Sequence, residues 1–314
     1  MARSLRYIPP RSLVEVTTRT VQARFLLRPS RDLNEIVLGI VGRAAQRYDV
    51  KVCAFVFLSN HAHLLLQPAD AEQLALFMGY VNGNLAKEAG RLHVWRERFW
   101  ARRYQAIVVS HEEAAQVARL RYLLDNGCKE SLVRRPADWP GAHCVEGLLS
   151  GRPLRGVWFD RSAEYEARRR GERVGKYTYS EEQELTLSPL PVWSRLERTE
   201  IRERVAEIVG EIEAATRRRI RKTGRNPLGI RRILRQHPHD KPERVNRSPA
   251  PRFHADRWAV RKGLELAYYA FRVAYRQAAE DLREGKLPVE FPAGCHLPRL
   301  PFARAAPAPA FASA

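Results

Sequence analysis

The feature that most constrains the fold is an apolar stretch that turns back on itself between residues 50 and 67. Residues 50–58 are apolar on both faces, which is typical of a strand in the interior of a sheet. Ser59 and Asn60 are turn-forming residues, and residues 61–67 return as a second apolar strand. The stretch therefore predicts an antiparallel hairpin at the centre of a sheet.

Two histidines stand on the returning strand of this hairpin. Successive side chains of a strand point to opposite faces, so His61 and His63 share one face and Ala62 lies on the other. Two neutral imidazoles on one rigid strand suit a divalent metal, because they lose little freedom on binding. The alternative is a half-buried strand whose exposed face carries histidines without a ligand. The H-x-H pattern alone does not separate the two interpretations.

The elements around the hairpin predict an α+β fold. We expect strands at residues 13–18 and 104–109, and helices at residues 32–48 and 71–92, from their apolar periodicity. The order strand, helix, strand, strand, helix, strand is that of the ferredoxin-like fold, an antiparallel sheet with helices on one face. RNA-recognition modules share this architecture, so the fold does not distinguish an enzyme from a binding protein.

A third helix is predicted at residues 114–126, after a capping box at residues 110–113. Tyr122 and Asn126 are four residues apart, so the phenol and the amide lie on one helical face. A tyrosine in an amphipathic helix more often serves packing than chemistry, and this alternative stays open.

Four motifs together resemble a known family. They are N-H-A-H-L-L-L at residues 60–66, F-W-A-R-R-Y-Q-A-I-V-V at 99–109, R-Y-L-L-D-N at 121–126 and D-W-P at 138–140. Their order and spacing resemble the single-tyrosine HUH transposases, and most of all the REP-associated tyrosine transposases and their insertion-sequence relatives. The resemblance covers roughly residues 5 to 160.

The resemblance implies a metal-dependent DNA strand-transfer enzyme. In that family the two histidines bind Mg²⁺ or Mn²⁺, which corresponds here to His61 and His63, and the residue one turn after the tyrosine, here Asn126, is often a third ligand. Tyr122 matches the nucleophile, which joins DNA as a 5′-phosphotyrosine and releases a 3′-OH. Two positions depart from the family pattern: Ala62 is smaller than the usual residue, and Asn126-Gly-Cys replaces N-P-V.

The proposed chemistry explains why a metal is expected. A phenol with a pKa near ~10 is a poor nucleophile at neutral pH, and the phosphodiester that it attacks is anionic. A cation polarises the phosphate and offsets the charge of the transition state. Tyr104 is a competing nucleophile, but it lies in a predicted strand without a partner amide at helical spacing.

The charge of the chain predicts a nucleic-acid partner. Its 55 Lys and Arg residues against 35 Asp and Glu give a formal net charge of +20, and such an excess favours binding to a polyanion. An Arg-rich proteome would explain part of the excess.

Two groups of basic residues are the expected DNA contacts. The first is Arg96, Arg98, Arg102 and Arg103, interleaved with Trp95, Phe99 and Trp100, and the second is Arg217, Arg218, Arg219, Arg221 and Lys222. The alternatives are a loop whose aromatic residues close the core, and a solvated helix face.

The four cysteines are far apart and form no C-x-x-C pair, which argues against a zinc ribbon and a disulfide framework. The N-terminal residues lack a signal-peptide pattern and no window is long and apolar enough to span a membrane, so we expect a cytoplasmic protein. We predict a transposase-like domain at residues 1–165, a linker at 166–197, a mostly α-helical basic region at 198–297 and a disordered Pro/Ala-rich tail at 298–314.

Three functions remain open on the sequence alone. The leading one is single-stranded DNA cleavage and strand transfer, by a monomer or homodimer acting on DNA with hairpin or palindromic elements. The second is a catalytically inactive single-stranded DNA or RNA-binding protein with the same fold. The third is a mononuclear metal hydrolase, which would need a general base near the histidine strand. The pair of Tyr122 and Asn126 favours the first.

Overall fold

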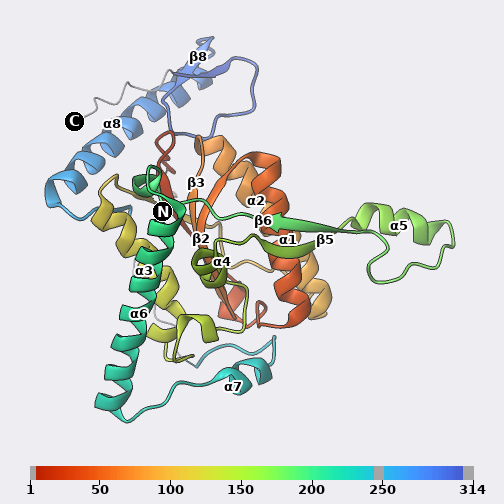
Figure 1. Ribbon diagram of the computed structural model, residues 1–314. Coiled ribbons are helices and arrows are strands. Elements are labelled where there is room, and N and C mark those ends of the chain that lie inside the picture. The colour runs from red at the N-terminus through yellow and green to blue at the C-terminus, as the bar shows by residue number, and fades with distance from the viewer. Residues whose placement is uncertain (1–4, 244–250, 307–314) are drawn as a thin grey trace.

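The computed structural model describes residues 5–243 and 251–306 of the chain (Figure 1). A five-stranded sheet lies at its centre, with the strand order β2-β3-β1-β4-β7. Its strands are β1 (Leu13–Arg19), β2 (Lys51–Leu58), β3 (His61–Gln67), β4 (Gln105–Val109) and β7 (Phe253–His254). The first four pair antiparallel, in the order of the ferredoxin-like fold, and β7 adds a short parallel strand beside β4. The predicted fold class is therefore confirmed.

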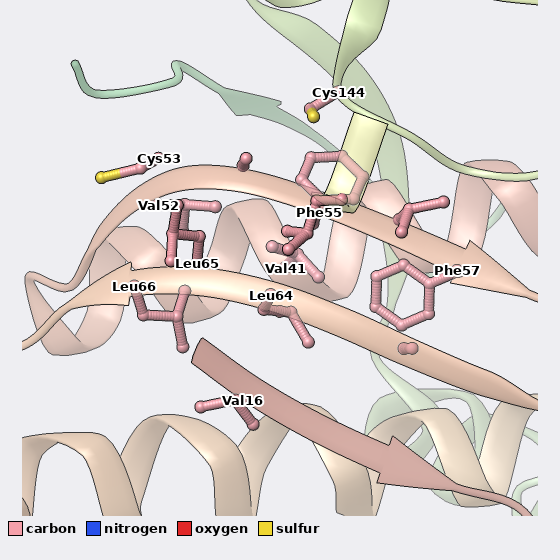
Figure 2. Close-up of a cluster of buried hydrophobic side chains, with 14 of the residues drawn as sticks. Val16, Val41, Val52, Cys53, Phe55, Phe57, Leu64, Leu65, Leu66 and Cys144 are labelled. Atoms are coloured by element: carbon pink, nitrogen blue, oxygen red, sulfur yellow. The ribbon is translucent and has the colours of Figure 1, made fainter. Parts of the chain in front are cut away.

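Helices α1 (Arg31–Tyr48) and α2 (Ala71–Leu92) cover one face of this sheet. Each begins where a side chain satisfies a free backbone N–H of the first turn: Ser30 accepts from Leu33, and Asp70 accepts from Gln73. Their apolar faces pack on the alternate residues of the strands. Figure 2 shows Val41 of α1, Phe55 of β2 and Leu64 of β3 in this buried cluster.

Helix α3 (Glu113–Lys129) contacts β2, β3 and β4. The predicted capping box at its start is wrong, because the Ser110 hydroxyl donates to the Glu112 carboxylate at 2.8 Å instead of capping the helix. The Glu112 carboxylate also accepts from the backbone N–H of Asp256 and from the Arg257 guanidinium. Glu112 thus joins the start of α3 to the C-terminal part of the chain, a contact that no local pattern contains.

The remaining elements surround this core. They are α4 (Val145–Ser150), β5 (Leu154–Phe159), α5 (Arg161–Arg169), β6 (Ser180–Leu185), α6 (Arg198–Thr223), α7 (Ile230–Arg235), α8 (Trp258–Arg283), β8 (Val289–Phe291), β9 (Ala303–Ala305) and three short 3-10 helices at Val21–Ala23, Pro136–Asp138 and Pro191–Trp193. Strand β6 lies within the range expected as a linker and pairs with β5. Strand β9 lies within the expected tail, whose residues 307–314 are outside the described residues. The division into domains stays a prediction.

The C-terminal half packs on the ferredoxin-like core at several places. Helix α6 runs beside α3 (Figure 1). Strand β7 extends the sheet beside β4. The N-terminal segment before β1 lies against the last elements: the Ile8 N–H donates to the Gly294 carbonyl at 2.9 Å, and the Tyr7 ring lies 4.7 Å from that of Phe271. Among the described helices, none is both long enough and apolar enough to cross a membrane.

The hairpin of β5 and β6 approaches α1 through two glycines. A Cβ at Gly156 would lie 2.1 Å from the Gly39 nitrogen and 2.5 Å from the Glu35 carbonyl oxygen. Both neighbours are backbone atoms that cannot rotate away. The close approach of strand and helix therefore depends on the absence of a side chain at residue 156.

We expect Gly156→Ala to lower the free energy of unfolding by about 1–3 kcal/mol, the range for overpacking a filled interior. Gly83→Ala is the matched control, because no atom lies within 4 Å of its added Cβ and it stands inside α2. The control should leave stability unchanged or raise it by up to about 1 kcal/mol. Urea denaturation measures both, and equal stabilities of the two variants would contradict the packing described here.

Candidate functional site

A cavity of about 650 Å³ lies between α3 and the face of the sheet that α1 and α2 leave uncovered. His61, His63, Tyr122 and Asn126 all line it. We call it the histidine cavity. The C-terminal half contributes to it as well, through residues that include His254 of β7. The four residues expected to act together are therefore brought together by one hairpin and one helix.

The three rings of the site lie edge to face. The centroids of His61 and His63 are 5.2 Å apart, and those of His63 and Tyr122 are 5.4 Å apart. The two histidines share one face of β3, and the tyrosine approaches them from α3, as the spacing of the sequence predicts. Their chemical roles stay predictions.

Hydrogen bonds orient both imidazoles. His61 Nδ1 lies 2.6 Å from the Asn60 side-chain oxygen, and His63 Nδ1 lies 3.1 Å from Glu15 Oε1 and 3.1 Å from the Thr17 hydroxyl. A carboxylate only accepts hydrogen bonds, so Nδ1 of His63 donates to Glu15, and Nε2 is the ring nitrogen left for a ligand. Partners of this kind hold metal-ligating histidines in other proteins. Both Nε2 atoms are thus available as ligands.

Glu15 is the buried carboxylate of the site, with only 2% of its surface exposed. Burial raises the pKa of this group, but hydrogen bonds from His254 and His63 outweigh it and hold the pKa below its usual range. His254 Nε2 lies 3.0 Å from Glu15 Oε2, and Arg119 lies 3.6 Å from the same oxygen. Glu15 therefore stays ionised and connects His254 to His63.

The surroundings of His61 keep its imidazole uncharged. Burial lowers the pKa of its imidazole well below the usual value, and the nearby His63 and Arg19 lower it further. The imidazole is therefore neutral near pH 7, the form that binds a metal.

Asn126 completes the set from α3. It is 3% exposed, and its side-chain nitrogen has no hydrogen-bond partner within the described residues. A buried N–H donor without a partner is costly unless an acceptor, such as a phosphate oxygen, compensates it, whereas a metal would bind the amide oxygen. The amide oxygen is a ligand that Mg²⁺ and Mn²⁺ prefer, whereas imidazoles suit softer divalent metals, so the expected metal stays a prediction. Within residues 5–243 and 251–306, no group of three or more His, Cys, Asp or Glu could hold a metal, so the amide matters to this interpretation.

Tyr122 is surrounded by positive charge. The Lys129 ammonium lies 4.7 Å and the Arg119 guanidinium 5.0 Å from its ring centroid. Burial nevertheless raises the pKa of the phenol, and the negative charge of Glu15 raises it further. The phenol thus stays protonated near pH 7, and it needs additional positive charge in the cavity to ionise.

Tyr104, the competing nucleophile, lies outside the histidine cavity. It is 8% exposed, and its ring lies 3.8 Å from the Arg6 guanidinium carbon. It lines a different cavity at the edge of β4. The position of Tyr104 therefore gives no support to a role as nucleophile.

The predicted DNA-contacting residues take different positions. In the first group, Arg102 and Arg103 line the cavity that contains Tyr104, whereas the Arg98 side chain donates to the Trp100 carbonyl at 2.7 Å. Phe99 of the same loop is buried, so this loop also covers part of the hydrophobic core. The members of the second group, Arg217, Arg218, Arg219, Arg221 and Lys222, lie on the last turns of α6 and do not line the histidine cavity. Arg96 is exposed.

Sequence reasoning missed several residues of the site. Glu15 had one available signal, since it is the lone carboxylate of an apolar strand and shares a face with Thr17. Arg119 and Lys129 follow the face of Tyr122 at helical spacing. His254 had no signal, because it reaches the site from a two-residue strand far along the chain.

Known proteins were compared with the chain. The comparison with curated proteins gives no match. Among solved structures, a REP-associated tyrosine transposase bound to a REP hairpin matches with a TM-score of 0.41 and 14% identity, covering 48% of this chain and 86% of that chain. A protein described as a transposase from Deinococcus radiodurans R1 matches with a TM-score of 0.28 and 17% identity, covering 38% and 95%.

The family described as "Transposase IS200 like" matches residues 20–123. This segment contains both histidines and Tyr122. The resemblance drawn from the motifs is therefore confirmed, and this part of the chain is similar to the IS200-like transposases.

Proposed function

We propose that this protein cleaves single-stranded DNA and transfers the strand through a 5′-phosphotyrosine on Tyr122. The observation that carries the proposal is the contact of the Tyr122 ring with His63, whose Nδ1 is held by Glu15. The match to a transposase family and the net charge of +20 support DNA as the partner. A cytoplasmic location is part of the proposal.

The residues divide the chemistry as follows. His61, His63 and Asn126 would hold Mg²⁺ or Mn²⁺, which supplies Lewis acidity toward the scissile phosphate. The Tyr122 oxygen attacks phosphorus and loses its proton, the bond from phosphorus to the 3′ oxygen breaks, and that oxygen takes up a proton. Lys129 and Arg119 lie close enough to stabilise the phenolate and the phosphate. The phosphotyrosine link conserves the energy of the phosphodiester bond that breaks, so strand transfer needs no nucleoside triphosphate.

Simple metal-dependent hydrolysis is less well supported. It requires a free general base beside the metal, and two carboxylates line the histidine cavity, Glu15 and Glu130. Glu15 Oε1 is bonded to His63, and Oε2 lies within ion-pair distance of His254 and Arg119 but has no hydrogen-bond partner within the described residues. An engaged, buried carboxylate is suited to orienting a ligand and not to activating water.

The proposal is tested with end-labelled single-stranded oligonucleotides that form hairpins, incubated with the protein and Mn²⁺ or Mg²⁺. We expect a denaturation-resistant protein–DNA product on a gel, together with a fragment that ends in a 3′-OH. Binding without any covalent product across a broad oligonucleotide pool would instead favour the catalytically inactive binding protein.

The C-terminal half should contribute to this site through His254. Its imidazole contacts the carboxylate that holds His63, and losing such an outer partner typically lowers metal affinity about 10–100-fold. We expect His254→Ala to raise the Kd for Mn²⁺ by about tenfold in calorimetric titrations without DNA. His254→Gln keeps a hydrogen-bond donor and should recover part of the affinity. His111→Ala is the matched control, since His111 is exposed. Unchanged Mn²⁺ affinity in a folded His254→Ala protein would refute the connection.

A further inference from the structure

A second cavity, of about 340 Å³, lies beside the histidine cavity at the edge of β4. Its walls carry Arg6, Arg102, Arg103 and Arg252, and none of its described lining residues is a carboxylate. We call it the arginine cavity. It shares Gln105, Ile107 and Pro251 with the histidine cavity, so the two are contiguous.

The positive charge of this cavity is not neutralised by the protein. Within the described residues none of the four arginines forms an ion pair with a carboxylate, and Arg6 spends one N–H on the Tyr104 carbonyl at 2.8 Å. Burial lowers the pKa of the Arg6 guanidinium to about 10, and the neighbouring Arg103 contributes to the decrease. Converging guanidinium groups without a counterion form a binding site for an anion, and their planar forks match a phosphate.

Aromatic side chains stand beside these cations. Arg6 lies over the Tyr104 ring at 3.8 Å, and Arg252 lies over the Tyr268 ring at 4.7 Å. The buried Tyr104 hydroxyl has no hydrogen-bond partner within the described residues. Both rings are buried, so they hold the arginines in place and leave the guanidinium groups to pair with a phosphate.

The edge of the sheet is open at the same place. Strand β7 pairs only with Val108 and Val109 of β4, so the preceding β4 residues that line the cavity have no strand partner on that side within the described residues. Their backbone N–H and C=O groups can bond the edges of a base. In a duplex the base edges are already paired, and one strand cannot enter a cavity of this size while it stays paired with the other. The cavity therefore suits a nucleotide of single-stranded DNA.

We propose that the arginine cavity binds a nucleotide of the single strand next to the phosphodiester that Tyr122 attacks. The proposal rests on the proposed function and adds a substrate site built by both halves of the chain. Arg6 and Arg103 come from the N-terminal half, whereas Arg252 and Tyr268 come from the C-terminal half. A strand that spans both cavities would present one phosphate to Tyr122 and its neighbour to the arginines.

The test compares two double variants of the full chain. R103A/R252A removes two exposed arginines of the cavity, and R261A/R276A removes two exposed arginines of α8 that do not line it. The probe is a fluorescent twelve-nucleotide oligodeoxythymidylate, titrated over a range of salt concentrations. We expect the cavity variant to bind about tenfold more weakly, with the slope of log K against log salt reduced by about 1.4, that is about 0.7 for each lost phosphate contact.

The outcomes separate this inference from the proposed function. R261A/R276A should stay within about twofold of the parent, because non-specific surface charge acts weakly at a distance. Equal weakening by both variants, or an effect on duplex but not on single-stranded DNA, overturns the nucleotide site. A parent protein that binds the oligonucleotide through the arginine cavity but forms no covalent product overturns the proposed catalysis and leaves the binding site standing.

Photo-crosslinking gives an independent readout. Oligonucleotides that contain 4-thiothymidine should crosslink to peptides that include Tyr104 or the segment from Arg252 to Tyr268. Crosslinks confined to other peptides would contradict binding of the nucleotide in the arginine cavity.

Discussion

Tyr122→Phe should abolish the covalent protein–DNA product, with cleavage lowered by at least about 10⁴-fold, the scale seen when a nucleophile is deleted. The substitution keeps the ring that packs against His63 and removes only the oxygen that would join phosphorus. Single-stranded DNA binding and Mn²⁺ affinity should therefore stay near those of the parent. Denaturing gels measure the covalent product, and calorimetry measures the metal.

Two further variants control this experiment. Tyr165→Phe removes the hydroxyl of an exposed tyrosine on α5, outside both cavities, and should keep full activity. Tyr104→Phe tests the competing nucleophile. If Tyr122→Phe cleaves at the parent rate and Tyr104→Phe does not, the assignment of the nucleophile is wrong.

His61→Ala should fail in a different way. It removes one of the two imidazoles that line the cavity, so Mn²⁺ affinity should fall by about 100-fold or more, beyond the effect of losing an outer partner. Covalent product should disappear with it at limiting metal. Single-stranded DNA binding in the absence of metal should be retained, because the arginines that we propose as contacts are untouched.

The comparison between the two variants is the informative part. Tyr122→Phe is expected to separate metal binding from chemistry, whereas His61→Ala is expected to lose both. His111→Ala again serves as the control for a histidine change on the surface. A His61→Ala protein that binds Mn²⁺ like the parent would show that the metal, if any, lies elsewhere.

Local patterns predicted most of the ferredoxin-like core. The apolar periodicity located α2, which buries one face, and the apolar run located the hairpin of β2 and β3. The run also predicted a central position for β2, which is wrong, because β2 is the edge strand and is buried on both faces by other elements. The juxtaposition of His61, His63 and Tyr122 followed from the periods of strand and helix together with the family resemblance.

The parts that were missed depend on contacts between residues far apart in the chain. Ser110 and Glu113 matched a capping pattern, but the Ser110 hydroxyl donates to Glu112, whose carboxylate also accepts from a backbone N–H and a guanidinium of the segment after residue 254. His254 reaches Glu15 only because a two-residue strand pairs with β4. A strand of two residues has no periodic pattern of apolar residues, so the position of β7 could not be predicted from the sequence alone.

The junction between the two halves also has a consequence for synthesis of the protein on the ribosome. Glu15 emerges early, whereas His254 and the Gly294 carbonyl that accepts from Ile8 follow roughly 10 to 60 s later at about 5–20 residues per second. Until then the edge of β4 has no β7, and the segment before β1 has no partner to pack against. A nascent chain thus cannot assemble either cavity in full until translation has passed the C-terminal helix, and the proposed cleavage of DNA would have to wait for that point.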